Sequence, residues 1–254
     1  MLRSKICLLL SALSVGAALA VAGCSRQKQA PPAAAQPTPA QQAELAVQGK
    51  LIFDQTPQHA AAYVGNKLSC GDCHIDSGKE PYAAPLVNIA NVFPAYTKRA
   101  GRVVSLQERI NECFVRSENG KPLPEDSPEM VALIAYLDSI SSGVKGQAAP
   151  QRGFVQVPAL TGNPAHGKQV YATQCAVCHG VNGEGVPTVL PPVWGPGAYN
   201  DGAGMDHVEK MAAFLVHNMP QNHPGTLKPQ EAFDVAAFIH SKPRPAFNPK
   251  YKGL

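Results

Sequence analysis

The chain has 254 residues, of which only 16% are charged, and it is rich in proline (24) and glycine (22). This length and composition favour one large domain or two small, loop-rich domains over a large helical bundle. The net charge of +4, without any run of lysine or arginine, argues against a nucleic-acid-binding protein.

The first 24 residues have the pattern of an export signal. Arg3 and Lys5 precede the apolar stretch "CLLLSALSVGAALAVA", which is too short for a comfortable membrane-spanning helix and ends in "VAGC". A cysteine after small residues resembles a lipobox, so we expect Cys24 to be acylated; an ordinary signal peptide cut nearby is the alternative. Acyl chains on Cys24 would anchor the protein to a membrane of a Gram-negative bacterium, in the periplasm, without spanning that membrane.

Residues 25–44 are alanine, proline and glutamine almost throughout. Such a segment cannot bury a hydrophobic core, because it has too few large apolar side chains. We expect it to be a stiff, disordered tether between the anchor and the folded part of the chain.

Two C-x-x-C-H motifs dominate the remaining sequence. Their residues are Cys70, Cys73 and His74 in "SCGDCH", and Cys175, Cys178 and His179 in "QCAVCHG". This spacing is typical of c-type haem, in which both thiols bond the porphyrin and the histidine coordinates the iron. Zinc is less consistent with an exported chain, and a dithiol redox pair does not need the histidine. The sequence therefore predicts two covalently attached haems c.

The flanks of the two motifs repeat as well. "GKLIF" at residues 49–53 and "GKQVY" at 167–171 each precede a motif, and each copy ends in an amphipathic helix, "SPEMVALIAYLDSI" or "KPQEAFDVAAFIHS". The predicted fold is all-α, with domain one at residues 45–142, a linker at 143–159, and domain two at 160–254. Each domain is expected to be a helical cytochrome c-like unit with one haem.

The second axial ligand of each iron decides its chemistry, and domain two offers several candidates. Met219, in the loop "HNMPQNHPG" before the last helix, is our choice for this position. Met205 is the second choice, and His217 and His223 could compete. Met211 lies on the apolar side of a predicted helix, which favours a role in the core.

Domain one has no obvious second ligand, because it lacks a loop methionine and no histidine follows His74 until His166. Its iron could stay open, take a lysine or take Cys113. The segment "SLQERINECFVRSENG" predicts a helix that begins with a capping box of Ser105 and Glu108 and stops near Gly120. Its expected inward face consists of Leu106, Ile110, Cys113, Phe114 and Ser117. Cys113 could be a buried structural thiol, but the empty iron position favours a thiolate ligand.

Four features together make the chain resemble di-haem thiosulfate dehydrogenase over nearly all of residues 45–254. They are the two haem motifs, the cysteine in "RINECFVRS", the segment "NGKPLPEDSPEM", and "LPPVWGPGAYNDGAGM" in domain two. The resemblance implies a periplasmic enzyme that joins two thiosulfates into tetrathionate, with the reverse reaction also open. It implies His74 and Cys113 as ligands of haem one, His179 and Met219 as ligands of haem two, and Arg99, Arg109 and Ser117 in the active site.

One position departs from the family pattern. Some members have a lysine directly before the distal methionine, whereas this chain has Asn218, so we do not expect an exchange of lysine and methionine on haem two. Arg99 and Arg109 suit the sulfonate oxygens of thiosulfate through bidentate bonds. The plain alternative for Arg109 is an ion pair with a surface carboxylate.

Two other functions compete with a thiosulfate dehydrogenase that passes electrons to a small redox protein such as a cytochrome c. One is a non-catalytic di-haem electron carrier, which would gain nothing from arginines around an inward cysteine. The other is a haem-thiolate subunit that resembles the one of the Sox multienzyme system. A fused, methionine-ligated second domain argues against that subunit, because such a domain resembles an electron exit.

Overall fold

The computed structural model describes residues 37–141, 154–155, 157–186 and 189–254. Cys24, the predicted signal segment and most of the predicted linker lie outside this range. The first helix, α1, runs from Pro39 to Asp54 and starts at a complete capping box between Thr38 and Gln41. Residues 39–44, which we predicted as the end of the tether, are therefore helical, because Thr38 and Pro39 form a good helix start.

Both domains are built on a close crossing of their first and last helices. In domain one, α1 packs against α7 (Pro128–Ser139) at Gly49, where any side chain would clash with the carbonyl oxygen of Ala132. In domain two, α8 (Pro164–Val170) packs against α11 (Pro229–His240) at Gly167, which meets the carbonyl of Asp234 in the same way. The repeated "GK" of the sequence thus marks the points where two helix backbones touch.

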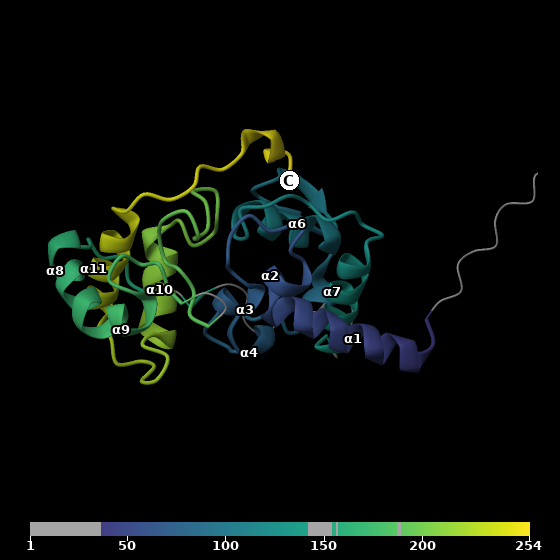
Figure 1. Cartoon of the computed structure of the whole chain (residues 1–254), viewed down its shortest axis with the longest axis horizontal. Helices are drawn as coiled ribbons and strands as arrows, with labels where there is room; N and C mark the ends of the chain where they lie inside the picture. Colours follow the sequence, from purple (N-terminus) through teal and green to yellow (C-terminus); the bar gives the residue numbers. More distant parts are fainter. Residues whose placement is uncertain (1–36, 142–153, 156, 187–188) are drawn as a thin grey trace, which may run out of the picture. The chain divides into compact units, whose positions relative to one another are not determined.

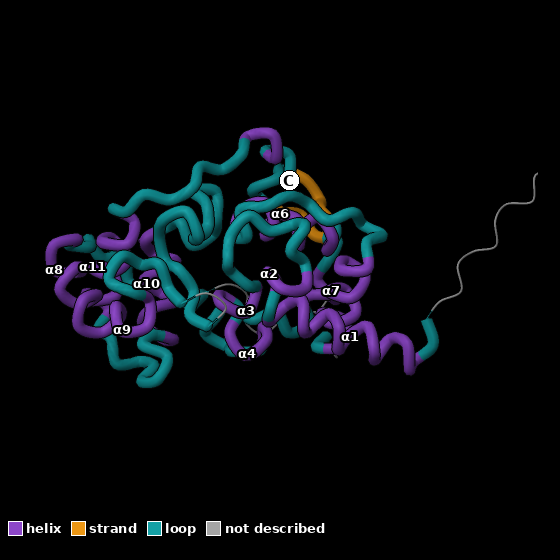
Figure 2. Tube along the Cα trace, viewed as in Figure 1, coloured by secondary structure: helices purple, strands orange, loops and turns teal. Residues whose placement is uncertain are grey.

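Between α1 and α7, domain one holds short helices and a hairpin. The helices are α2 (Thr56–His59), α3 (Cys70–Cys73), α4 (Ile75–Gly78) and α5 (Ile89–Val92). The hairpin pairs β1 (Ala95–Thr97) with β2 (Arg102–Val104) in antiparallel register and contains the only strands among the described residues (Figure 2). Gly101 allows its turn, with φ at +67°. The all-α prediction is correct for the bulk of the fold, but it omitted this hairpin.

Helix α6 (Leu106–Arg116) carries the isolated cysteine. The predicted capping box is confirmed, with Ser105 Oγ accepting from the Glu108 amide and Glu108 Oε2 accepting from the Ser105 amide. The helix ends earlier than we predicted, since Asn119 and not Gly120 takes the left-handed conformation, with φ at +47°. Asparagine tolerates this conformation because its short polar side chain can bond locally.

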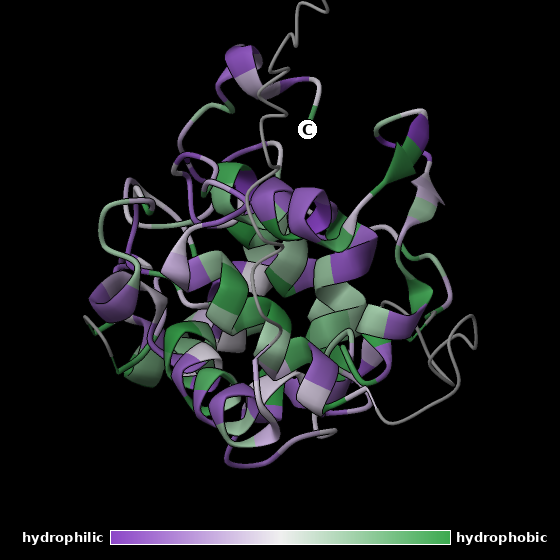
Figure 3. Ribbon diagram, turned by 90° about the vertical axis from the view of Figure 1, so that its right-hand side faces the viewer, coloured by the Kyte–Doolittle hydropathy of each residue, from purple (hydrophilic) through white to green (hydrophobic). Residues whose placement is uncertain are grey.

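Domain two continues from α8 into a π-helical turn, η1 (Tyr171–Cys175), and α9 (Ala176–His179). After a long loop follow α10 (Val208–Asn218), α11 and a short 3-10 turn, η2 (Pro249–Tyr251). In Figure 3 the ribbon is mostly green, for hydrophobic residues, where the helices meet, and largely purple, for hydrophilic residues, on their outer turns. Among the described residues, no helix is long and apolar enough to cross a lipid bilayer.

The two domains are joined by side-chain amides that bond backbone carbonyls across the boundary. Asn66 donates to Ser117 O at 2.7 Å and to Ala198 O at 3.1 Å, while Asn200 donates to Val115 O at 2.9 Å. The C-terminal residues, after leaving α11, reach back to domain one beside α6 (Figure 1), where Arg116 donates to Leu254 O. The end of α6 is therefore held by domain two on several sides.

Candidate haem and substrate site

One cavity of domain one is lined by all five residues that we predicted on the inward face of α6. It also contains the first C-x-x-C-H motif, so Cys70, Cys73, His74 and Cys113 share this cavity. The rest of the wall is mostly apolar, with Phe53, Leu86, Phe93 and Leu133 among its residues. Met130 does not line it, because its fully buried side chain packs in the core of domain one. An apolar slot of this kind with thiols and an imidazole fits a haem c.

The imidazole of His74 is oriented for metal binding. Its Nδ1 lies 2.7 Å from the carbonyl oxygen of Ala84, to which a neutral ring donates its single N–H. Burial lowers the pKa of His74 to about 4, so the ring is neutral at physiological pH. The Nε2 atom then keeps its lone pair for an iron, which is the arrangement that metal-binding histidines commonly use.

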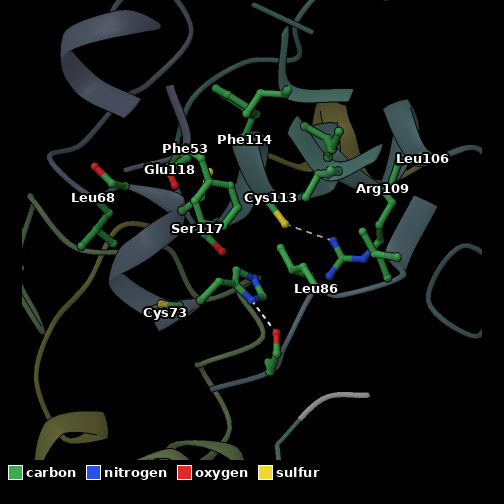
Figure 4. A pocket seen from close by; sticks show the side chains of 18 of the residues that line it. Phe53, Leu68, Cys73, Leu86, Leu106, Arg109, Cys113, Phe114, Ser117 and Glu118 are labelled. Carbon is green, nitrogen blue, oxygen red and sulfur yellow. Dashed lines mark hydrogen bonds between the residues drawn. The ribbon is translucent and has the colours of Figure 1, made fainter. Parts of the chain in front are cut away.

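Cys113 lies one helical turn after Arg109, and the two side chains touch. Arg109 Nη1 is 3.1 Å from Cys113 Sγ, as Figure 4 shows. The negative charge of a Cys113 thiolate is the main cause that raises the pKa of Arg109. Arg109 also lies 3.5 Å from the buried carboxylate of Glu112. Arg109 therefore has a carboxylate partner beside its contact with sulfur, but this partner is buried and is not the surface carboxylate of the plain alternative.

Arg99 and Ser117 lie on a second cavity that borders the first. This cavity is shared by both domains and also contains His74, Arg109 and Cys113. Arg99 is exposed and donates from Nη1 to Gly202 O in domain two at 3.1 Å. Ser117 is the C-cap of α6, and Figure 4 shows its hydroxyl close to the cavity that Cys113 faces. The structure thus brings together the four residues that we predicted for catalysis.

Arg116, in the last turn of α6, turns away from the thiol of Cys113. Its side chain is 6% exposed, lies over the ring of Phe247 at 4.3 Å, and bonds Leu254 O at 2.8 Å. Arg116 therefore serves the junction with the C-terminal residues. Helical spacing could not separate Arg109 from Arg116, since the partners of Arg116 are more than 130 positions away in the sequence.

A buried carboxyl group lies on the haem side of the domain one cavity. Glu118 is 1% exposed, and its Oε2 has no hydrogen-bond partner within the described part of the chain. Burial raises the pKa of Glu118 well above its usual range, which favours the neutral acid over the carboxylate. Sequence reasoning missed this residue because a glutamate after a helix normally faces water.

The cavity of domain two repeats the plan of domain one. It is lined by Cys175, Cys178, His179 and Met219, and His179 Nδ1 lies 2.9 Å from Pro191 O. Met205 lies on the shared cavity near Cys113 instead, and Met211 is buried in the core. His223 also lines the domain two cavity, whereas His217 stacks on Tyr82 of domain one at 4.6 Å. The cavity therefore offers an imidazole and a thioether for a second haem c.

The two haem motifs are neighbours in space. Gly71, Asp72 and Ile75, from the first motif and the residue after it, line the cavity of domain two. Burial raises the pKa of Asp72 to about 6. A second link runs through Asn218, which donates to Tyr82 O at 3.0 Å and directly precedes Met219. The loop that contains Tyr82 also contains Ala84, the partner of His74.

The linker and domain two contribute residues to the shared cavity that the sequence did not suggest. They are Phe154, Val155, Val157, Gly204, Met205, His207, Glu209, Lys210 and Ala213. Most of the polar ones are exposed residues around the start of α10. No motif distinguishes them in the sequence, because their position depends on how the two domains pack.

Comparison with known proteins assigns both halves of the chain. Residues 58–145 match the family model "SoxA/TsdA, cytochrome c domain", and residues 164–242 match "Cytochrome c". The thiosulfate dehydrogenase of Stutzerimonas stutzeri is 42% identical over 209 residues, which cover 80% of this chain and 68% of that protein. The chain belongs to the thiosulfate dehydrogenase family.

Two further members support the assignment. The thiosulfate dehydrogenase of Allochromatium vinosum is 37% identical over 80% of both chains. The solved structure of thiosulfate dehydrogenase (TsdBA) from Marichromatium purpuratum aligns with a TM-score of 0.74 at 35% identity. That alignment covers 82% of this chain and 47% of the other, so this chain spans about half the length of the solved relative. The family membership confirms the predicted fold of two cytochrome c domains.

Proposed function

We propose that this protein is a thiosulfate dehydrogenase, which joins two thiosulfates into tetrathionate and releases two electrons. The observation that carries this proposal is the contact of 3.1 Å between Arg109 Nη1 and Cys113 Sγ on a cavity shared with His74. A cation beside the sulfur stabilises the thiolate and attracts a dianionic substrate to the same place. A simple electron carrier would have no use for this arrangement.

Four cysteines and two histidines are proposed to hold two haems c. Cys70, Cys73 and His74 would bind haem one, with Cys113 as its second ligand. Cys175, Cys178, His179 and Met219 would bind haem two. The chemistry that these haems supply when bound is the acceptance of single electrons, which sulfur chemistry at Cys113 releases in pairs.

Cys113 is proposed to act as a nucleophile as well as a ligand. Its thiolate sulfur and the outer sulfur of one thiosulfate would form an S–S bond. In this step Cys–S⁻ and S2O3²⁻ become Cys–S–S–SO3⁻, and two electrons are released. The outer sulfur of a second thiosulfate would then attack the sulfane sulfur, form tetrathionate and return Cys113 as a thiolate. Both steps balance in charge and need no proton. The same residues would serve tetrathionate reduction in reverse.

The electrons are proposed to leave through domain two to a small redox protein such as a cytochrome c. Val177, inside the second haem motif, is 86% exposed, and Val181 just after it is 76% exposed. Cys178 is also exposed, whereas Cys70 and Cys73 are half-buried. An accessible motif supports electron transfer to a partner, because transfer requires close approach of the two cofactors.

A direct assay tests the proposed function. The purified protein with both haems is mixed with thiosulfate and an artificial one-electron acceptor, and tetrathionate and reduced acceptor are both quantified. We expect one tetrathionate and two electrons for every two thiosulfates consumed, without a second protein. Reduction of the acceptor without tetrathionate would contradict the proposal, and a requirement for a thiol-bearing carrier protein would favour a Sox-type subunit.

The lipid anchor and the periplasmic location are part of the same proposal. They rest on the pattern of residues 1–24, which ends at Cys24. Cys24→Ser should release an otherwise active enzyme from the membrane fraction, because the tether has no part in the chemistry. Membrane association that stays unchanged in this variant would contradict the lipoprotein hypothesis.

A further inference from the structure

The reaction proposed above requires two thiosulfate dianions to meet with their sulfurs in contact. Their charges repel, and the repulsion grows when water is displaced from between them. Arg109, at 3.1 Å from Cys113 Sγ, is placed to receive the first dianion. A second dianion needs another cation on the same cavity, on the side away from Arg109.

The shared cavity has three permanently cationic side chains and one carboxylate. Arg99 and Arg109 come from domain one, and Lys210 comes from the first turns of α10 in domain two. Among the described residues, Glu209 is the only acidic one that lines it. The lining therefore has an excess of positive charge that comes from both domains, which suits a ligand with two negative charges.

Within the described residues, the ammonium group of Lys210 makes neither a hydrogen bond nor an ion pair. The adjacent Glu209 acts on its charge only from a distance. Burial lowers the pKa of Lys210, and repulsion from Arg99 and Arg109 lowers it further. Lys210 is thus close enough to both arginines to be repelled by them, and a bound anion would relieve that repulsion.

His207 lies one turn before Lys210 and lines the same cavity. It is the N-cap residue of α10, but its side chain makes no capping bond. Burial and the charges of Lys210 and Arg99 lower the pKa of His207, in spite of Asp206 and Glu209 nearby. A neutral imidazole at this point offers an N–H donor to an oxyanion without adding to the repulsion.

We propose that Lys210, assisted by His207, forms the binding site for the sulfonate of the second thiosulfate. In this arrangement Arg109 and Cys113 of domain one hold the first thiosulfate, and α10 of domain two presents the second to it. For tetrathionate, the two sulfonates would lie at these two places. The active site is then complete only when both domains are present, although the reacting cysteine belongs to domain one.

The subsite rests on the proposed function, so the experiment separates the two. Wild-type protein with both haems is compared with Lys210→Gln, Lys210→Arg and the control Lys168→Gln, which removes an exposed lysine of α8 on the same domain. The measurements are the KM for thiosulfate and, by calorimetry at constant ionic strength, the binding of sulfate as an unreactive dianion. Haem content and circular dichroism confirm that each variant is folded.

In Lys210→Gln we expect the KM to rise and sulfate binding to weaken by about tenfold or more, as the loss of one charge-assisted hydrogen bond predicts. Lys210→Arg should recover most of the affinity for thiosulfate and for sulfate, and Lys168→Gln should match the wild type in both measurements. An active wild type with unchanged KM and sulfate binding in Lys210→Gln would overturn the subsite and leave the proposed function intact. A wild type that binds sulfate through Lys210 but does not oxidise thiosulfate would instead overturn the proposed function.

Discussion

Arg109 and Cys113 are linked by a contact of 3.1 Å between Nη1 and Sγ, and Oε2 of Glu112 lies 3.5 Å from the same Nη1. All three residues belong to one face of α6, at spacings of three and four positions. Glu112 is buried, so its charge is only partly screened by water. The arginine can therefore keep its place beside the sulfur while its remaining N–H groups bind substrate.

Arg109→Lys tests the role of the guanidinium fork. Lysine keeps the positive charge, but it cannot contact the sulfur, Glu112 and a sulfonate at the same time. We expect the KM for thiosulfate to rise about tenfold, with a smaller effect on kcat. The control is Arg102→Lys, which changes an exposed arginine of β2 that pairs with Glu108 at 2.7 Å. A KM equal to that of the wild type would show that Arg109 acts only as a structural ion-pair partner.

Cys113→Gly tests whether the sulfur is part of the chemistry. The variant should keep both haems and the fold, because Cys113 is half-buried and the core around Phe114 stays in place. Turnover should fall by roughly 10³-fold or more, as expected when a nucleophile is removed. Mass spectrometry of wild-type protein treated with tetrathionate should find a sulfane sulfonate adduct on the Cys113 peptide. Full activity of Cys113→Gly would leave only oxidation of thiosulfate without covalent catalysis.

Met219 and Met205 form a matched pair for the second ligand of haem two. Met219 lies on the cavity of His179, whereas Met205 lies on the cavity of Cys113. Oxidised protein should show a near-infrared band of a methionine-ligated iron, and Met219→Gly should abolish this band while Met205→Gly keeps it. The opposite pattern would assign the ligand to Met205.

Much of this site could be predicted from the sequence, because several of its parts are formed by residues that are close together in the chain. The capping box of Ser105 and Glu108, the inward face of α6 and the two haem motifs depend on residues within a few turns of one another. Periodicity and spacing report such relationships directly. The core position of Met211 could also be predicted, because the apolar stripe around it is typical of a buried helix face.

The remainder depends on contacts between distant segments. Lys210 and His207 are exposed residues at the start of a helix, and they matter only because α10 borders the cavity of domain one. Arg116 looks like Arg109 in the sequence, but its partner is Leu254. The hairpin of β1 and β2 was missed because its strands have three residues each, which is too short for a clear alternation.

The last prediction concerns stability and its dependence on pH. Asp234 of α11 is 2% exposed and joins α11 to the start of α8. Its carboxylate accepts from the Asn163 amide at 2.7 Å, from Gln230 Nε2 at 2.8 Å, and from His166 Nδ1 at 2.7 Å. Burial opposes ionisation of Asp234, but these bonds outweigh burial and lower its pKa below the usual value of 3.8.

A lowered pKa in the folded state means that the ionised group stabilises the fold. This contribution is fully present above the unfolded pKa, and it is lost as the pH falls through the lower, folded pKa. Asp234→Asn should therefore lower the free energy of unfolding by about 1.5–3 kcal/mol at pH 7, the range for hydrogen bonds to a charged group. The difference from the wild type should shrink as the pH falls below about 4, where Asp234 takes up a proton. Urea unfolding of the protein with both haems, followed by circular dichroism at each pH, measures this difference. The control is Asp126→Asn in an exposed loop of domain one. A difference that still grows below about pH 4 would show that Asp234 is held as a neutral acid, and that burial outweighs its three bonds.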